Sequence, residues 1–168
     1  MFVLGNIFEN KCFEIGFKTS HLSLFFPPTA QKMAAQICWI AGSLIYLLLG
    51  SIHLYYTFFT DKFLAKNPNT VAEMQNTPPL LTHKTTMWKA WVGFNASHSL
   101  GAIYLGMVNI LLAGQYFHIL EKSISILALT FFTSAFYLFL GRKYWFNVPL
   151  TGILVATCCY GAAIVLIF

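Results

Sequence analysis

The sequence predicts an all-α integral membrane protein that folds as a four-helix bundle. Of its 168 residues, 58% are hydrophobic and only 9% are charged, whereas a soluble domain carries roughly 25% charged residues. The mean hydropathy is +0.68. Four apolar stretches reach the length of roughly 20 residues that a membrane-spanning helix needs. Too little charge remains to cover a water-exposed surface, so most of the surface is expected to face lipid.

The first residues differ from the rest of the chain. Residues 1–32 mix Phe with Lys, Glu and Asn, show no sustained hydrophobic period and contain the pair Pro27-Pro28. We expect an interfacial tail or a short amphipathic helix here, unless translation starts at Met33. Residues 33–168 are expected to form one four-span transmembrane domain.

The apolar stretches give the positions of the helices. The spans are predicted at residues 36–59, 90–114, 123–141 and 148–168. Pro149 suits the first turn of the fourth helix, where its missing N–H costs nothing, and Gly141 suits the end of the third. Aromatic side chains near the span ends are expected at the level of the lipid headgroups; these are Trp39, Phe58, Trp88, Trp91, Tyr144 and Trp145.

The connection between the first two spans, residues 60–89, is the only long one. Asn67 and Pro68 predict a capped short helix that ends before Pro78. A loop of this length usually has structure or a role of its own. We expect a lid, with one or more of these residues packed on the mouth of the bundle: Val71, Met74, Leu80 or Leu81. Because the other connections are short, the helices are predicted to alternate in an up-down-up-down bundle.

The positive charges indicate an orientation. The chain carries a net charge of +5, but its Lys and Arg residues form no basic face, so we predict no nucleic-acid partner. On the side of the long loop lie Lys62, Lys66, Lys84, Lys89, Arg142 and Lys143, and on the other side Lys11, Lys18, Lys32 and Lys122. Basic residues flank spans on the cytoplasmic side. The long loop is therefore predicted in the cytoplasm and both termini outside.

Two histidines lie inside two different spans and mark the candidate site. At about 1.5 Å per helical residue, His53 lies about 9 Å and His98 about 12 Å below the same membrane face. An ionisable side chain inside a span is costly and usually faces the bundle interior. The spacing of polar residues predicts a pocket in the half of the bundle beneath the long loop, formed by His53, Asn95, His98, Ser99, Ser134, Tyr137 and Thr151.

Three roles for the histidine pair are compatible with the sequence. The first is a pocket for a small apolar or amphipathic molecule, and the second is a structural hydrogen-bond lock between helices. The third is ligation of haem b by His53 and His98, with Gly50 and Gly101 making room for the ring. A haem-binding electron-transfer subunit or small membrane oxidoreductase is therefore the alternative to the leading prediction, a non-enzymatic membrane protein.

Other chemistry has little support in the sequence. All five carboxylates, Glu9, Glu14, Asp61, Glu73 and Glu121, lie outside the spans, which argues against proton pumping and hydrolysis. Asp61, Glu73 and His83 are interpreted as ordinary solvated loop residues, and no metal site is predicted. The four cysteines have no zinc-binding spacing, and no disulfide is predicted.

Two segments resemble a known group of proteins. GSIHLYYTFFTDKF (residues 50–63) and MWKAWVGFNASHSLGAI (residues 87–103) are similar to segments of small bacterial multi-span membrane proteins known only as conserved hypothetical proteins. The resemblance implies a compact membrane protein, in a bacterial inner membrane, and transfers no activity. Its architecture also resembles, more faintly, four-helix quinone-linked membrane subunits. The expected partners are the lipid bilayer, a small ligand, and a second copy or a membrane partner subunit.

Overall fold

The structure, a computed structural model, describes residues 27–168 and is helical, with no strand in this range. Its elements are α1 (Pro28–Phe59), the 3-10 helix η1 (Asp61–Phe63), α2 (Pro68–Asn76), α3 (Met87–Gln115), α4 (Phe117–Lys122), α5 (Ile124–Tyr144) and α6 (Asn147–Ile167). Four of them, α1, α3, α5 and α6, are long and apolar enough to cross a membrane. The prediction of an all-helical fold with four helices long and apolar enough to span a membrane is confirmed for the described residues.

The start of the first helix differs from the expectation. Helix α1 begins at Pro28, well before residue 36, because a proline fits the first helical position. Residues 27–32, expected in the tail, therefore belong largely to this helix. Residues 1–26, which include Lys11 and Lys18, lie outside the described part of the chain. The rest of the predicted tail, residues 1–26, and the start at Met33 are not tested by the structure.

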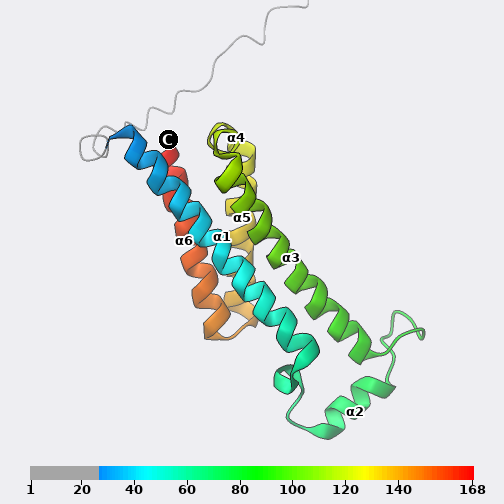
Figure 1. The fold of residues 1–168 in the computed structure, drawn as a ribbon. Coiled ribbons are helices and arrows are strands. Elements are labelled where there is room, and N and C mark those ends of the chain that lie inside the picture. Colours follow the sequence, from blue (N-terminus) through cyan, green and yellow to red (C-terminus); the bar gives the residue numbers. More distant parts are fainter. Residues whose placement is uncertain (1–26) are drawn as a thin grey trace, which may run out of the picture.

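The four long helices lie side by side, and successive ones run in opposite directions (Figure 1). Helix α1 packs most extensively against α3 and α6, and α5 packs against α6. The C-terminus and the start of α1 lie at one end, whereas α2 lies at the other end beside the start of α3 (Figure 1). Helix α1 is thus the central element of the bundle.

Helices α1 and α3 approach closely at two glycines. A Cβ atom on Gly106 would lie 2.7 Å from both the Ser43 carbonyl oxygen and the Leu47 nitrogen. A Cβ atom on Gly50 would lie 2.9 Å from the Ser99 carbonyl oxygen. In lipid the hydrophobic effect does not drive helices together, so helices associate through close packing instead. Small residues such as glycine allow the two backbones to approach closely enough for this packing.

Buried hydrogen bonds join the helices below the candidate site. Trp39 Nε1 and Thr130 Oγ1 both donate to Asn109 Oδ1, at 3.0 and 3.2 Å. The expectation that Trp39 lies at headgroup level is wrong, because this side chain is fully buried. The early start of α1 places Trp39 about 16 Å along the helix, at 1.5 Å per residue, and so inside the core.

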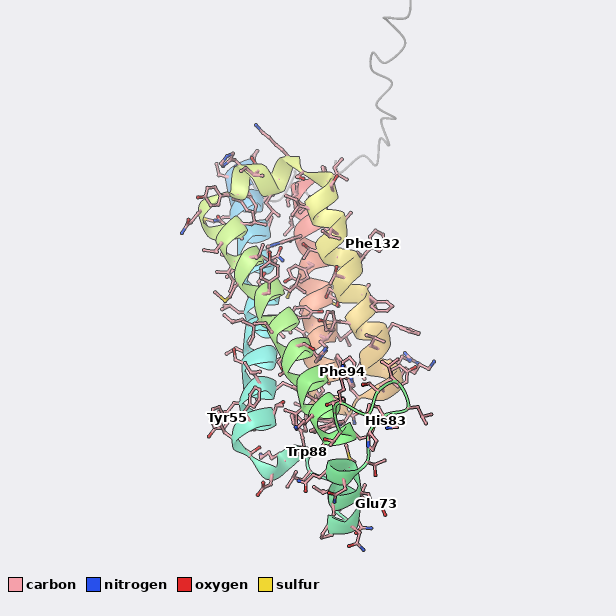
Figure 2. The ribbon with its side chains drawn as sticks, turned by 90° about the vertical axis from the view of Figure 1, so that its right-hand side faces the viewer. Tyr55, Glu73, His83, Trp88, Phe94 and Phe132 are labelled. Carbon is pink, nitrogen blue, oxygen red and sulfur yellow. The ribbon has the colours of Figure 1, made fainter. Side chains whose placement is uncertain are left out.

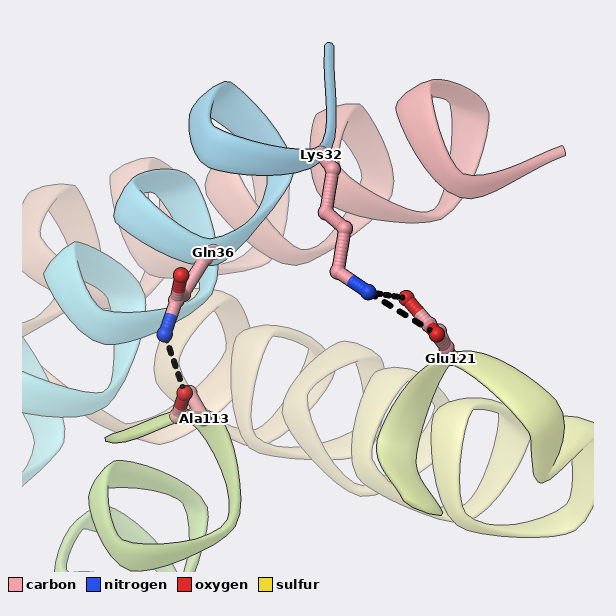
Figure 3. Close-up of polar contacts among 4 residues, drawn as sticks. All are labelled: Lys32, Gln36, Ala113 and Glu121. Carbon is pink, nitrogen blue, oxygen red and sulfur yellow. Dashed lines mark hydrogen bonds and ion pairs between the residues drawn. The ribbon is translucent and has the colours of Figure 1, made fainter. Parts of the chain in front are cut away.

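At the end of the bundle away from the long loop, an ion pair and a hydrogen bond fasten α1 to its neighbours (Figure 3). Lys32 Nζ lies 2.8 Å from Glu121 Oε2, and Gln36 Nε2 donates to the Ala113 carbonyl oxygen at 2.6 Å. The Lys32 and Glu121 side chains are partly exposed, so their pairing contributes little to stability.

The outer faces of the helices are apolar. Tyr55 of α1 and Phe132 of α5 project outward from the bundle (Figure 2), and both are largely exposed. A soluble protein rarely leaves such side chains in a contiguous patch. The exposed apolar faces are compatible with contact to a lipid bilayer.

The long connection has structure of its own. Asn67 Oδ1 caps α2 by accepting from the Asn69 N–H at 3.0 Å, and α2 packs beside α3. Leu80 and Leu81 are fully exposed and do not cover the bundle, whereas Val71 and Met74 of α2 are half-buried. The lid is therefore excluded for the two leucines and stays a prediction for α2. The loop residue that reaches the bundle interior is Phe63 of η1.

Candidate functional site

A cavity of about 510 Å³ lies in the half of the bundle next to the long loop. Its walls come from α1, η1, α3, α5 and the region where α5 passes into α6. Five of the seven predicted site residues line it: His53, Asn95, His98, Ser99 and Tyr137. The antiparallel directions of α1 and α3 bring His53 and His98 to the same level, since each lies near the loop end of its helix.

The two histidines are in direct contact. Their ring centroids are 5.6 Å apart, and the rings meet edge to face. The His53 ring also lies against Phe63, at 4.5 Å between centroids. The short helix η1 thus closes the cavity on the loop side with an aromatic ring.

His53 is held in one orientation by Asn95. The Asn95 amide donates from Nδ2 to the Trp91 carbonyl oxygen at 2.8 Å, which directs Oδ1 to His53 Nε2 at 3.0 Å. Because a carbonyl oxygen only accepts, His53 Nε2 carries the proton and donates. This bond joins α1 to α3 and fixes the His53 ring.

His98 is held differently. Within residues 27–168 its imidazole makes no hydrogen bond, and its ring packs against Tyr137 and Trp145, at 5.5 and 5.0 Å between centroids. The Tyr137 hydroxyl and Trp145 Nε1 also have no hydrogen-bond partner in this range. Every fully buried side-chain nitrogen or oxygen described does have a partner. These three polar groups are therefore accessible, and they belong to side chains that line the cavity.

Two predicted residues lie elsewhere. Ser134 is fully buried, and its hydroxyl contacts Tyr46 Oη at 2.9 Å and Thr157 Oγ1 at 2.7 Å, so it supports the cavity wall through Tyr46. Thr151 is exposed and donates to the Asn147 carbonyl oxygen at 2.9 Å. Neither residue lines the cavity.

Most of the aromatic wall lies outside the predicted set of site residues. Phe63, expected in the connecting loop, and Trp145, expected at headgroup level, line the cavity together with Tyr56, Phe94 and Phe146, and Tyr46 of α1 lines it too. The density of aromatic residues just before and after the loop-side span ends was the available signal. Such residues are usually interface anchors, which is why the signal favoured another interpretation.

The arrangement does not offer a slot for haem b. Ligation by two histidines needs one nitrogen of each ring directed at an iron between them. Here the rings contact each other, and His53 Nε2 donates to Asn95. Gly50 leaves no space for a macrocycle, because the position where its side chain would stand is occupied by the α3 backbone at Ser99. Gly101 faces the Tyr137 hydroxyl instead.

The loop residues and cysteines form no comparable group. Among residues 27–168, no set of three or more His, Cys, Asp and Glu side chains is placed to hold a metal ion. Glu73 and His83 both lie in the long connection, apart from each other (Figure 2). Cys38, Cys158 and Cys159 are free thiols.

Comparison of the chain with models of known protein families, with curated proteins and with solved structures finds no match. The resemblance of the two histidine segments to small bacterial membrane proteins therefore stays a prediction.

Proposed function

We propose that this protein is a non-enzymatic membrane protein whose loop-side cavity binds a small amphipathic molecule around His53 and His98. The observation that carries the proposal is the aromatic-walled cavity of about 510 Å³ with accessible, unpaired polar groups on His98 and Tyr137 within the described residues. Sites for small molecules typically measure about 300 to 1,000 Å³ and combine apolar walls with a few polar groups. Asn95 and Ser99 complete the proposed set of binding residues.

The orientation is part of the same proposal. We infer an up-down-up-down bundle in a bacterial inner membrane, with the cavity and the long loop on the cytoplasmic side and the C-terminus outside. Among the described basic residues, Lys32 and Lys122 lie at the end away from the loop. Six lie on the loop side: Lys62, Lys66, Lys84, Lys89, Arg142 and Lys143. This asymmetry supports the assignment.

The test is mass spectrometry of the intact protein released from native membranes in mild detergent. We expect a retained small molecule on the wild-type protein and its loss in His98→Leu. His118→Leu is the matched control, because His118 is exposed on α4 at the far end of the bundle. A wild-type protein that carries only bulk phospholipid, at the same level as His98→Leu, would refute the proposal.

A structural role is the competing function, and the His53–Asn95 bond between α1 and α3 favours it. Stability separates the two, because His98 itself makes no hydrogen bond in the described chain. Under the binding proposal, His98→Leu keeps the unfolding temperature of ligand-free protein within a few degrees of wild type. A structural lock at His98 would instead require a large loss of stability and expression.

A further inference from the structure

The lining of the cavity favours a neutral ligand. None of the residues that line it is Asp, Glu, Lys or Arg. A charged group would therefore enter an environment of low polarity without a counter-charge, and burying an unpaired charge is strongly unfavourable. Histidine imidazoles and aromatic rings, in contrast, suit a neutral polar molecule.

The lining also favours a ligand with hydrogen-bond acceptors. Trp145 Nε1 is a donor only, and the Tyr137 hydroxyl and a neutral His98 imidazole each supply a donor. All three are without a partner in residues 27–168. The Asn95 Oδ1 acceptor is already taken by His53, whereas the second nitrogen of His98, the Tyr137 oxygen and His53 Nδ1 can also accept. Trp145 Nε1 can only donate, so a neutral molecule that uses this donor together with those of Tyr137 and His98 carries acceptors such as carbonyl oxygens.

The shape of the wall favours a flat ring. Seven of the lining residues have aromatic side chains of Phe, Tyr or Trp and come from α1, η1, α3, α5 and the α5–α6 turn: Tyr46, Tyr56, Phe63, Phe94, Tyr137, Trp145 and Phe146. Aromatic pairs prefer offset-stacked or edge-to-face contacts. A planar ring can make both kinds of contact here while its edge reaches His98 and Tyr137.

One side of the cavity is open to the lipid-facing surface. Phe94, Phe146 and Val148 line the cavity and are also 76%, 64% and 70% exposed. These side chains are apolar and stand on the outer faces of α3 and the start of α6. An apolar tail attached to the ring can therefore leave the cavity between these side chains into the bilayer.

We propose that the ligand is a lipid-soluble quinone, a neutral planar ring with two carbonyl acceptors and an apolar tail. This inference rests on the proposed function and names the ligand class of that same cavity. The ring lies between Phe63, Phe94 and Trp145, and its carbonyls accept from Tyr137 and His98. Binding is the whole proposal and includes no electron transfer.

The test uses purified full-length protein in nanodiscs of synthetic phosphatidylcholine, free of quinone. Decyl-ubiquinone is titrated while tryptophan fluorescence is followed, because a quinone seated against Trp145 quenches that side chain. We expect saturable quenching by the wild-type protein. Tyr137→Phe and His98→Leu each weaken the apparent affinity about five- to tenfold, since each removes one hydrogen bond to the ligand.

Two matched variants separate the site from quinone dissolved in the bilayer. Tyr104→Phe makes the same change as Tyr137→Phe on an exposed, lipid-facing side chain of α3, and His118→Leu matches His98→Leu. Both should behave like the wild type. Linear, unsaturable quenching, or equal affinities in all five proteins, overturns the quinone assignment.

The two proposals can fail separately. A retained native molecule that is lost in His98→Leu but is not a quinone, combined with no saturable quinone binding, overturns the ligand class and leaves the binding function intact. Preference for a tailed alkylammonium cation over decyl-ubiquinone would refute the argument from neutrality. Because Tyr137→Phe removes one hydroxyl, it keeps the test decisive if His98→Leu fails to fold.

Discussion

The backbone contact between α1 and α3 predicts a large difference between two identical substitutions on one helix. In Gly106→Ala, the new Cβ atom would stand 2.7 Å from the Ser43 carbonyl oxygen and the Leu47 nitrogen. Ordinary van der Waals contacts begin near 3.4 Å, and a helix backbone cannot rotate out of the way as a side chain can. The two helices must therefore separate by several tenths of an ångström along a tightly packed interface.

The magnitude follows from two opposing effects. Overpacking a tight interface costs about 1 to 3 kcal/mol, and replacing glycine by alanine inside a helix returns up to about 1 kcal/mol. Gly106→Ala should then lose up to about 2 kcal/mol of stability. At about 2 to 4 °C per kcal/mol for a chain of this size, its unfolding temperature should fall by up to about 8 °C.

The assay is thermal unfolding in a mild detergent, followed by the loss of the monodisperse peak in size-exclusion chromatography. Gly114→Ala is the control, because a Cβ atom there meets nothing within 4 Å. That variant should match or exceed the wild-type unfolding temperature. Equal unfolding temperatures for the two alanine variants would show that α1 and α3 do not pack as described.

Two further predictions concern the core and the orientation. Asn109→Leu removes the acceptor of both Trp39 Nε1 and Thr130 Oγ1, so thermal unfolding should show a loss of about 1 to 3 kcal/mol; wild-type stability would show that this network is dispensable. In a cysteine-free background, a membrane-impermeant maleimide should label Leu81→Cys only in inside-out vesicles, and Tyr116→Cys, at the opposite end of α3, only in right-side-out vesicles. The reverse pattern would place the long loop outside.

The spans were predictable because lipid imposes a simple requirement on the chain. A helix that crosses a bilayer needs an unbroken apolar stretch, and residues 90–114 and 148–168 fall within about three residues of α3 and α6. The start of α1 was not predictable in this way. Its first turns include Lys32, whose charge is paired with Glu121, and this tertiary partner is invisible in hydropathy.

The site residues that could be predicted from the sequence are polar residues within otherwise apolar helices. His53, Asn95 and His98 stand out in apolar helices, and all three line the cavity. Thr151 shows the limit of the method, since the buried face of α6 carries Ile153, Ala156 and Tyr160 instead. In a membrane the outward face is as apolar as the core, so a lone threonine does not mark the inward face of a helix.

The unequal environments of the two histidines are the strongest argument for binding. A histidine that only joins helices should use its nitrogens, as His53 does with Asn95. His98 packs by its ring alone within the described chain, and its ring nitrogens are accessible at the cavity. Because an apolar side chain would suit this position in a membrane helix better, we propose that the imidazole serves a partner that enters the cavity from outside the chain.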